Sequence, residues 1–190
     1  MLLHYLGLFL LIRFENRNEK IWVGLHEETA RVLEGDEILS DVGVDYTPLR
    51  DLLSSSQWKK ADEETGAIML KISGRVAAGW LREEDIETFP CADLQTIDSL
   101  WLKYSGDRFG FTAQCHIWES VGRDYGKLGD TVGWRSQQSY SPWRHYSELD
   151  FSLNAPTGHL PAAPFFKFCE LAIGWTATLP SKLNCCTQDF

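Results

Sequence analysis

The chain has 190 residues with a formal net charge of −9, and 44% of its residues are hydrophobic. This size and composition are typical of a single globular domain and exclude a wholly disordered chain. Residues 1–100 hold 19 acidic against 10 basic side chains, whereas residues 101–190 hold 8 of each. Since no basic face is visible, we expect no binding to nucleic acid or to anionic membranes. We interpret the acidic half as a solvated surface, with a docking surface for a basic partner as the alternative.

Residues 1–44 are expected to form a short N-terminal arm of uncertain structure. The run from Met1 to Ile12 is almost wholly apolar. It is too short to span a bilayer, which takes about 20 residues, and it lacks the basic start and cleavage site of a signal peptide. We expect a buried segment or a start codon placed too far upstream, with a membrane-surface anchor as the alternative. The expected location is therefore cytoplasmic, with at most peripheral association with a membrane.

The cysteines number five, and their spacing matches no disulfide framework. We therefore expect a reducing compartment and a domain that folds without a disulfide. No C-x-x-C pair occurs, so no structural metal is expected. Cys115 is interpreted as a small core residue. The neighbours Cys185 and Cys186 are interpreted as part of a featureless tail, with a redox or soft-metal site as the alternative.

From residue 45 onward the spacing of apolar residues predicts helices, and strands are nearly absent. Thr47 followed by Pro48 is typical of a helix start. Apolar residues three and four apart predict a helix over residues 58–72 and a second, cleaner one over 94–104, which places Trp101 in the core. Shorter helices are expected at 83–87, 112–121, 125–132, 162–172 and 175–186, the last interrupted by Pro180. The predicted fold class is all-α, with one helical domain over residues 45–186.

A loop of about 28 residues, rich in aromatic side chains, is expected between residues 134 and 161. Loops this long are uncommon and usually functional. The chain has no phosphate-binding loop, nucleophile elbow or helical zinc motif, so we predict that it is not an enzyme. We interpret His145 as solvent-exposed and expect the ring of His159 to bond the backbone. The loop favours a pocket for a large flat hydrophobic ligand, or a protein interface.

Several blocks of the domain form a recognisable series. They include DYTPLRDLL at residues 45–53, FPCADL at 89–94, RFGF at 108–111 and SLNAPTGHLP at 152–161. In unbroken order over about residues 45–186, these blocks resemble the genomes-uncoupled tetrapyrrole-binding family of oxygenic phototrophs. The resemblance implies a domain of cupped-hand shape whose apolar palm binds protoporphyrin IX, its magnesium form or a bilin.

The same resemblance implies a function and a partner. The best-known family members are not enzymes, and they activate magnesium chelatase through its large porphyrin-binding subunit. The chain is thus expected to be a non-catalytic tetrapyrrole-binding regulator of chlorophyll biosynthesis, peripheral to photosynthetic membranes. The site residues that the resemblance implies line the palm and its covering loop: Ile86, Phe109, Phe111, Trp143, Tyr146, Leu149, Phe151 and Lys167.

One departure from the family supports an alternative function. Beyond the Gly-His-Leu-Pro motif, the chelatase activators supply an Asn and two Arg near the propionates of the porphyrin. Here Lys167 stands in place of one arginine, and Glu170 lies near the second position, where it would repel a carboxylate. The alternative is a sensor or protein-interaction module that keeps the fold but has lost high-affinity porphyrin binding.

Overall fold

The computed structural model describes residues 4–6, 9–11, 38–136, 142–166 and 175–186 of the chain. The chain divides into two compact units, Met1–Asp36 and Glu37–Phe190. In the first unit, β1 (His4–Leu6) and β2 (Phe9–Leu11) pair antiparallel as a hairpin, with His4 opposite Leu11. The sequence pattern did not predict these strands within the expected arm.

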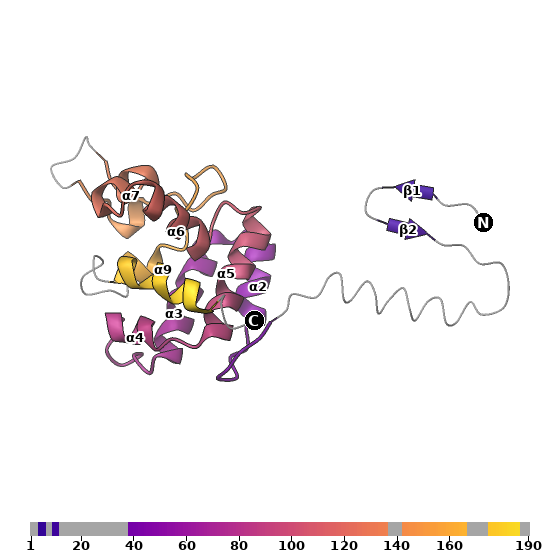
Figure 1. Ribbon diagram of the computed structural model, residues 1–190, viewed down its shortest axis with the longest axis horizontal. Coiled ribbons are helices and arrows are strands. Elements are labelled where there is room, and N and C mark those ends of the chain that lie inside the picture. Colours follow the sequence, from indigo (N-terminus) through magenta and orange to yellow (C-terminus); the bar gives the residue numbers. More distant parts are fainter. Residues whose placement is uncertain (1–3, 7–8, 12–37, 137–141, 167–174, 187–190) are drawn as a thin grey trace. The chain divides into compact units, whose positions relative to one another are not determined.

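The second unit is helical, and it confirms the predicted all-α class (Figure 1). The chain order of the elements is α2 (Thr47–Ser54), α3 (Trp58–Ile72), α4 (Glu83–Glu87), α5 (Cys91–Ser105), α6 (Phe111–Ser120), α7 (Tyr125–Thr131), the 3-10 turn η1 (Tyr146–Glu148), α8 (Ala163–Phe166) and α9 (Trp175–Cys186). Among the described residues, no helix is both long enough and apolar enough to cross a bilayer.

The centre of the core is a cluster of three aromatic side chains. The rings of Trp58, Trp101 and Phe109 lie 5.7–6.3 Å apart by their centroids. Trp101 has no exposed surface, as its sequence stripe predicted, and its indole nitrogen donates to the buried Thr65 hydroxyl at 2.9 Å. The hydrogen bond satisfies the only polar atom of the indole, so the whole ring can be buried.

The compact unit begins earlier than the expected boundary at residue 45. The buried carboxylate of Asp93 in α5 accepts hydrogen bonds from the Ser40 hydroxyl, the Asp41 amide and the Tyr46 hydroxyl. Residues 40–46 are therefore fixed on α5, although their composition is typical of a linker.

The cysteine interpretation is wrong in one respect. Cys91, the first residue of α5, and Cys186, the last residue of α9, form a disulfide. They lie 95 residues apart in sequence, so only the packing of α9 on α5 brings them together. Cys186 is buried and is not part of a featureless tail, whereas Cys115 and Cys185 are free thiols. Cys169 lies outside the described residues.

The predicted interruption at Pro180 is also wrong, because α9 runs through it. A proline inside a helix removes one backbone hydrogen bond. Leu179 and Leu183, which are four residues apart, are both buried. Their packing offsets the missing hydrogen bond and keeps the helix continuous.

We expect Trp101→Ala to lower the free energy of unfolding by about 3–5 kcal/mol, because it leaves a large cavity in the aromatic cluster. Trp80→Ala is the matched control, since the Trp80 ring is half-buried and stacks under Arg75 at 4.6 Å. It should cost about 1 kcal/mol. Chemical denaturation monitored by circular dichroism measures both, and equal costs would contradict a central role for Trp101.

Candidate functional site

Three of the residues expected to line the palm lie in the hydrophobic core. Ile86, Phe109 and Phe111 have no exposed surface. Phe109 belongs to the central aromatic cluster, and Phe111 is the first residue of α6. They can contact a ligand only if neighbouring elements move, and their binding role stays a prediction.

The structure brings together three of the loop residues. The rings of Tyr146 and Phe151 lie 5.2 Å apart in an edge-to-face arrangement, and both side chains are half-buried. Leu149, between them in sequence, is buried in the core. The Lys59 ammonium of α3 lies 5.7 Å from the centroid of the Phe151 ring. This part of the loop therefore lies against α3.

Trp143 belongs to a different aromatic group. It stacks on Tyr125 of α7 with the ring centroids 4.5 Å apart, and the Arg135 guanidinium lies 5.4 Å from its ring. Trp143 and Arg135 also pair as an isolated β-bridge. The ring thus packs on α7, and its predicted role in covering the palm stays a prediction. Lys167, expected to bind a propionate, lies outside the described residues, as does Glu170.

A buried carboxylate holds the loop in place. Asp62 of α3 accepts hydrogen bonds from the backbone amides of Ala162 and Ala163 at 2.5 and 2.9 Å, and from the Tyr146 hydroxyl at 2.7 Å. Burial raises the pKa of Asp62 to about 6, although the three hydrogen bonds act to lower it. Asp62 is an acidic residue within the helix predicted over residues 58–72, so the spacing of apolar residues did not mark it as buried. Its position four residues after Trp58 and three before Thr65 was the signal that it faces inward.

The Gly-His-Leu-Pro segment, residues 158–161, is bound to α6 through one side chain. The Gln114 amide nitrogen donates to the Gly158 carbonyl at 3.0 Å and to the Pro161 carbonyl at 2.8 Å. The Trp134 indole donates to the His159 carbonyl at 2.9 Å. The motif therefore serves to attach the end of the loop to α6.

The His159 ring bonds the backbone, as expected. Its Nδ1 lies 2.6 Å from the Val132 carbonyl, and its Nε2 accepts from the Asp150 amide at 3.1 Å. This pair of partners requires the neutral ring with the proton on Nδ1. Burial lowers the pKa of His159, which also favours the neutral form. His145 is exposed, again as expected.

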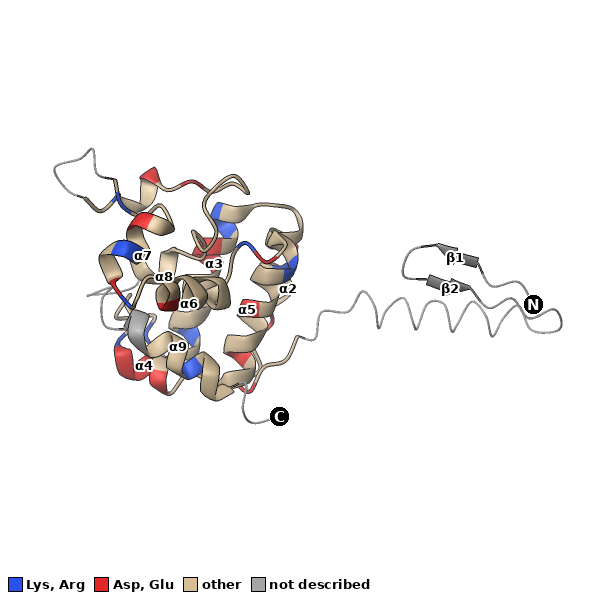
Figure 2. Cartoon of the chain, turned by 45° about the horizontal axis from the view of Figure 1, so that its top comes forward, with Lys and Arg blue, Asp and Glu red and all other residues tan. Residues whose placement is uncertain are grey.

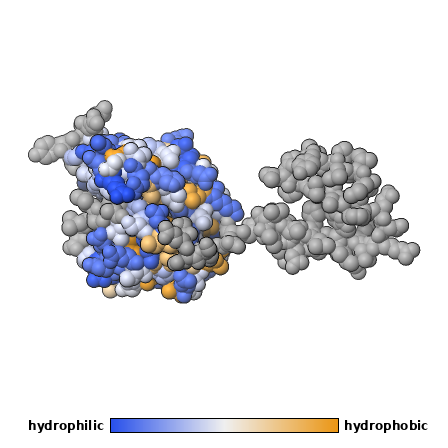
Figure 3. All heavy atoms as spheres, in the orientation of Figure 1, coloured by the Kyte–Doolittle hydropathy of each residue, from blue (hydrophilic) through white to orange (hydrophobic). Residues whose placement is uncertain are grey.

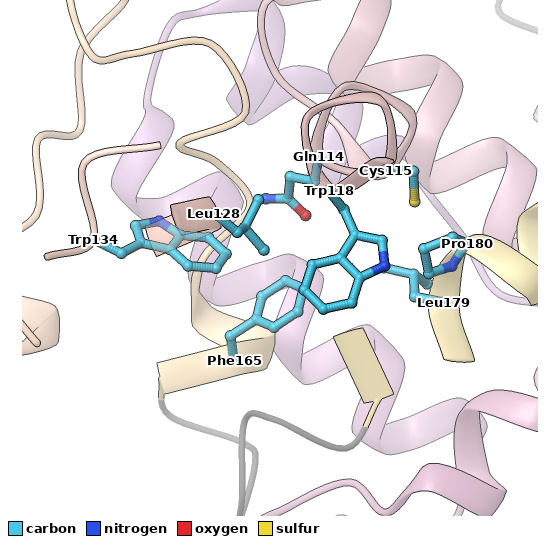
Figure 4. A pocket seen from close by; sticks show the side chains of 8 residues that line it. All are labelled: Gln114, Cys115, Trp118, Leu128, Trp134, Phe165, Leu179 and Pro180. Atoms are coloured by element: carbon cyan, nitrogen blue, oxygen red, sulfur yellow. The ribbon is translucent and has the colours of Figure 1, made fainter. Parts of the chain in front are cut away.

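An apolar cavity lies between α6, α7, α8 and α9 (Figure 4). The space that the centre of a water-sized sphere can occupy in it is about 10 Å³, which is room for about one water molecule. Its aromatic walls include Trp134 and Phe165, whose ring centroids are 5.0 Å apart. The eight lining residues are Gln114, Cys115, Trp118, Leu128, Trp134, Phe165, Leu179 and Pro180.

The cavity holds one polar atom without a partner. Among the described residues, nothing hydrogen-bonds to the buried Gln114 Oε1, although the amide nitrogen of the same side chain has two acceptors. In Figure 4 this oxygen points between the rings of Phe165 and Trp118. A buried acceptor without a donor is costly, so it favours a ligand that carries an N–H or O–H group.

Nothing about the cavity indicates catalysis. Burial raises the pKa of the Cys115 thiol far above its usual range, so it is protonated and a poor nucleophile. Within the parts of the chain that the structure describes, no group of three or more metal-ligating side chains occurs. The aromatic walls and the unpartnered acceptor suit an apolar molecule with one N–H or O–H donor, but the walls must move apart to admit anything larger than a water molecule.

The sequence alone does not indicate this cavity. Trp118, Leu128 and Leu179 lie within the helices expected at residues 112–121, 125–132 and 175–186. These positions carry ordinary core side chains, so no local pattern distinguishes a cavity wall from a core. Only the packing of four helices leaves the space open.

The face of the helical unit that Figure 3 shows is mostly polar. Figure 3 shows small apolar patches among hydrophilic residues on the face in view, and Figure 2 shows the acidic residues of α4. Within α4, Asp85 is buried and pairs with Arg82 at 2.8 Å and with Arg75 at 3.3 Å. The Arg82 hydrogen bond lowers the pKa of Asp85. Within the acidic half that was expected to be solvated, the three glutamates of α4 are exposed, whereas Asp85 is buried and structural.

The match to a known protein family falls within the helical unit. A family model described as GUN4-like matches residues 39–174. A "Ycf53-like protein" of Synechocystis is 36% identical over 121 residues, which are 63% of this chain and 51% of that protein. A "Tetrapyrrole-binding protein, chloroplastic" of Arabidopsis thaliana is 32% identical over 125 residues, covering 61% and 47% of the two chains. The chain spans about half the length of these curated relatives.

Two solved structures share the fold. GUN4 from Chlamydomonas reinhardtii superposes with a TM-score of 0.63 at 26% identity, over 80% of this chain and 95% of that one. Ligand-free Arabidopsis thaliana GUN4 gives a TM-score of 0.57 at 28% identity, with the same coverage. These matches confirm the resemblance found in the sequence.

We expect the neutral His159 ring to make the free energy of unfolding depend on pH. Because its folded pKa lies below the unfolded value of about 6.5, the unfolded chain binds more protons, and stability falls as the pH drops below about 6.5, by at most about 1.4 kcal/mol per pH unit. The parent should therefore lose stability relative to His159→Gln between pH 7.5 and 5.5 in urea denaturation. The Asp62 titration acts in the opposite direction but is common to both proteins. Parallel pH profiles would contradict a neutral His159.

Proposed function

The chain belongs to the GUN4-like family, and on that premise we propose that it is a non-catalytic regulator that binds a tetrapyrrole in the cavity beside α6. The observation that carries the proposal is an apolar space walled by Trp118, Trp134 and Phe165 in a domain of this family. A tetrapyrrole is flat and rich in π electrons, so it gains from burial and from stacking on aromatic faces. The name of the Arabidopsis relative supports the same ligand class.

The unpartnered Gln114 Oε1 supports a choice among tetrapyrroles. In a free-base porphyrin the N–H groups point to the centre of the ring, where a side chain at the edge cannot reach them. An open-chain bilin carries lactam N–H groups at its ends, and these can donate to an acceptor at a cavity wall. We therefore propose that a bilin satisfies Gln114 better than protoporphyrin IX or its magnesium form.

Partner and location follow from the same proposal. A non-catalytic regulator exerts its effect through another protein. From the family context, we propose the large porphyrin-binding subunit of magnesium chelatase as that partner. Glu83, Glu84 and Glu87 of α4 are exposed and offer a negative surface to it. We place the protein in the cytoplasm or a plastid, at most peripheral to photosynthetic membranes.

A second candidate function rests on the size of the cavity. Sites for drug-sized ligands commonly measure about 300–1,000 Å³, whereas this cavity has room for little more than one water molecule. Together with the departure at Lys167 and Glu170, the small volume favours an interaction or sensor module that no longer binds a macrocycle. The two candidates differ in whether the cavity accepts a tetrapyrrole at all.

Cys115 provides a direct test of the cavity. We expect Cys115→Phe to fill the space beside Trp118 and weaken tetrapyrrole binding at least tenfold, a loss of about 1.4 kcal/mol. Titration of the full chain with a bilin and with protoporphyrin IX, in buffer containing dithiothreitol and monitored by tryptophan quenching, measures this effect.

Cys115→Ser is the matched control, because it keeps the volume of the side chain and should leave affinity within about twofold. Thermal unfolding of both variants identifies any loss of folding. Equal affinities for the parent and Cys115→Phe would show that the ligand does not enter this cavity. If the parent quenches with neither ligand, the interaction-module candidate is favoured.

A further inference from the structure

Helix α9 covers the cavity from one side. Leu179 and Pro180 of α9 form part of the cavity wall. The helix packs on α4, α5 and α6 through a buried stripe of Leu179, Leu183 and Cys186. In Figure 1 it is the yellow helix that lies between α4 and α6.

The residues of α9 lie beyond those that the family model matches, which end at residue 174. The helix therefore lies outside the part of the domain that the family model describes. It also covers α4, which has α9 as its main helical neighbour and carries the fully buried Ile86. The cavity and the expected palm residue Ile86 therefore share one cover.

Among the described residues, the C-terminal end of the cover is held covalently. The Cys91–Cys186 disulfide joins it to the start of α5, and the Gln95 amide donates to the Cys186 carbonyl at 2.7 Å. Nearer the N-terminal end, the Thr178 hydroxyl donates to an exposed Glu83 carboxylate. A surface hydrogen bond of this kind is open to competition from water and contributes little.

The helix itself is weak. It has 12 residues, a length at which an isolated helix is marginal in water, and Pro180 removes one of its backbone hydrogen bonds. Its helical state therefore depends on being held against the domain. The disulfide ties the C-terminal end of α9 directly to the start of α5. Loss of this bond therefore lowers the effective concentration of α9 at the cavity.

From this arrangement we propose that α9 is a redox-controlled cover: the Cys91–Cys186 disulfide holds it over the cavity, and reduction lets it leave and opens the apolar face to the ligand. The inference rests on the proposed function, because it assigns a regulation to the same site. The proposal also accounts for the small volume of the cavity, because the structure holds the disulfide and is therefore in the covered, oxidised state.

The reductant is a dithiol, either a small molecule or a protein. Its thiolate attacks the sulfur of Cys91, which is partly exposed, whereas Cys186 is buried. The protein S–S bond breaks, a mixed disulfide forms on Cys91, and Cys186 leaves as a thiolate that takes up a proton. The second thiol of the reductant then displaces Cys91. In sum the protein gains two electrons and two protons, and the dithiol becomes a disulfide.

The test compares the oxidised and reduced full chain in a Cys185→Ser background, which removes the exposed free thiol beside the bridge. Protoporphyrin IX and a bilin serve as probes. We expect dithiothreitol to increase the affinity for the probe that binds at least tenfold. Adding Cys91→Ser should give the high affinity with and without dithiothreitol, and Cys186→Ser should repeat this result if Cys91→Ser folds poorly.

Hydrogen exchange of residues 175–186 provides a readout that needs no ligand. Reduction should accelerate exchange in α9 while α3 stays protected, which separates release of the cover from general unfolding. Equal affinity and equal α9 exchange in both redox states would overturn the cover while leaving the proposed function intact. If neither probe binds in either redox state, the proposed function is overturned, and with it the regulation of binding, even if α9 exchange rises.

Discussion

The arrangement of the loop and cavity depends on the buried carboxylate of Asp62. Its two oxygens accept from Tyr146 in the loop and from Ala162 and Ala163 at the start of α8. One side chain of α3 thereby fixes two segments that begin 84 and 100 residues away in sequence. Burial of the carboxylate is unfavourable and raises its pKa to about 6. Three donors in a region of low dielectric offset that cost, so the position of α8 relative to α3 is specified as well as stabilised.

A second set of polar contacts completes the frame around the cavity. Gln114 binds the carbonyls of residues 158 and 161, and the His159 ring joins Val132 to Asp150. These bonds replace the regular secondary structure that a long loop lacks, because they satisfy backbone groups that would otherwise be buried without partners. The consequence is a rigid wall on three sides of the cavity. Helix α9 forms the remaining side, and the Cys91–Cys186 disulfide joins its end to α5.

Much of the fold could be predicted from local sequence patterns. The apolar spacing of residues 58–72 and 94–104 identified α3, α5 and the buried Trp101, because amphipathic periodicity depends only on neighbours within two turns. The burial of Asp62 and the Cys91–Cys186 bond depend on contacts between distant segments, which no local pattern encodes. The continuation of α9 through Pro180 has the same origin, since packing of Leu179 and Leu183 outweighs local propensity. The cavity was missed for this reason too: its walls are core residues whose incomplete packing appears only in three dimensions.

A covering helix changes what the ligand affinity of the domain means. The ligand must compete with the chain's own C-terminal segment, so the apparent association constant is the intrinsic one multiplied by the fraction of molecules in which the cavity is uncovered. Each 1.4 kcal/mol by which α9 prefers the covered state therefore costs about tenfold in affinity. The rest of the domain supplies the aromatic walls, and α9 sets how often they are reached. The affinity of such a chain can change without any change to the residues that touch the ligand, because the disulfide at the end of α9 shifts only the balance between covered and uncovered states.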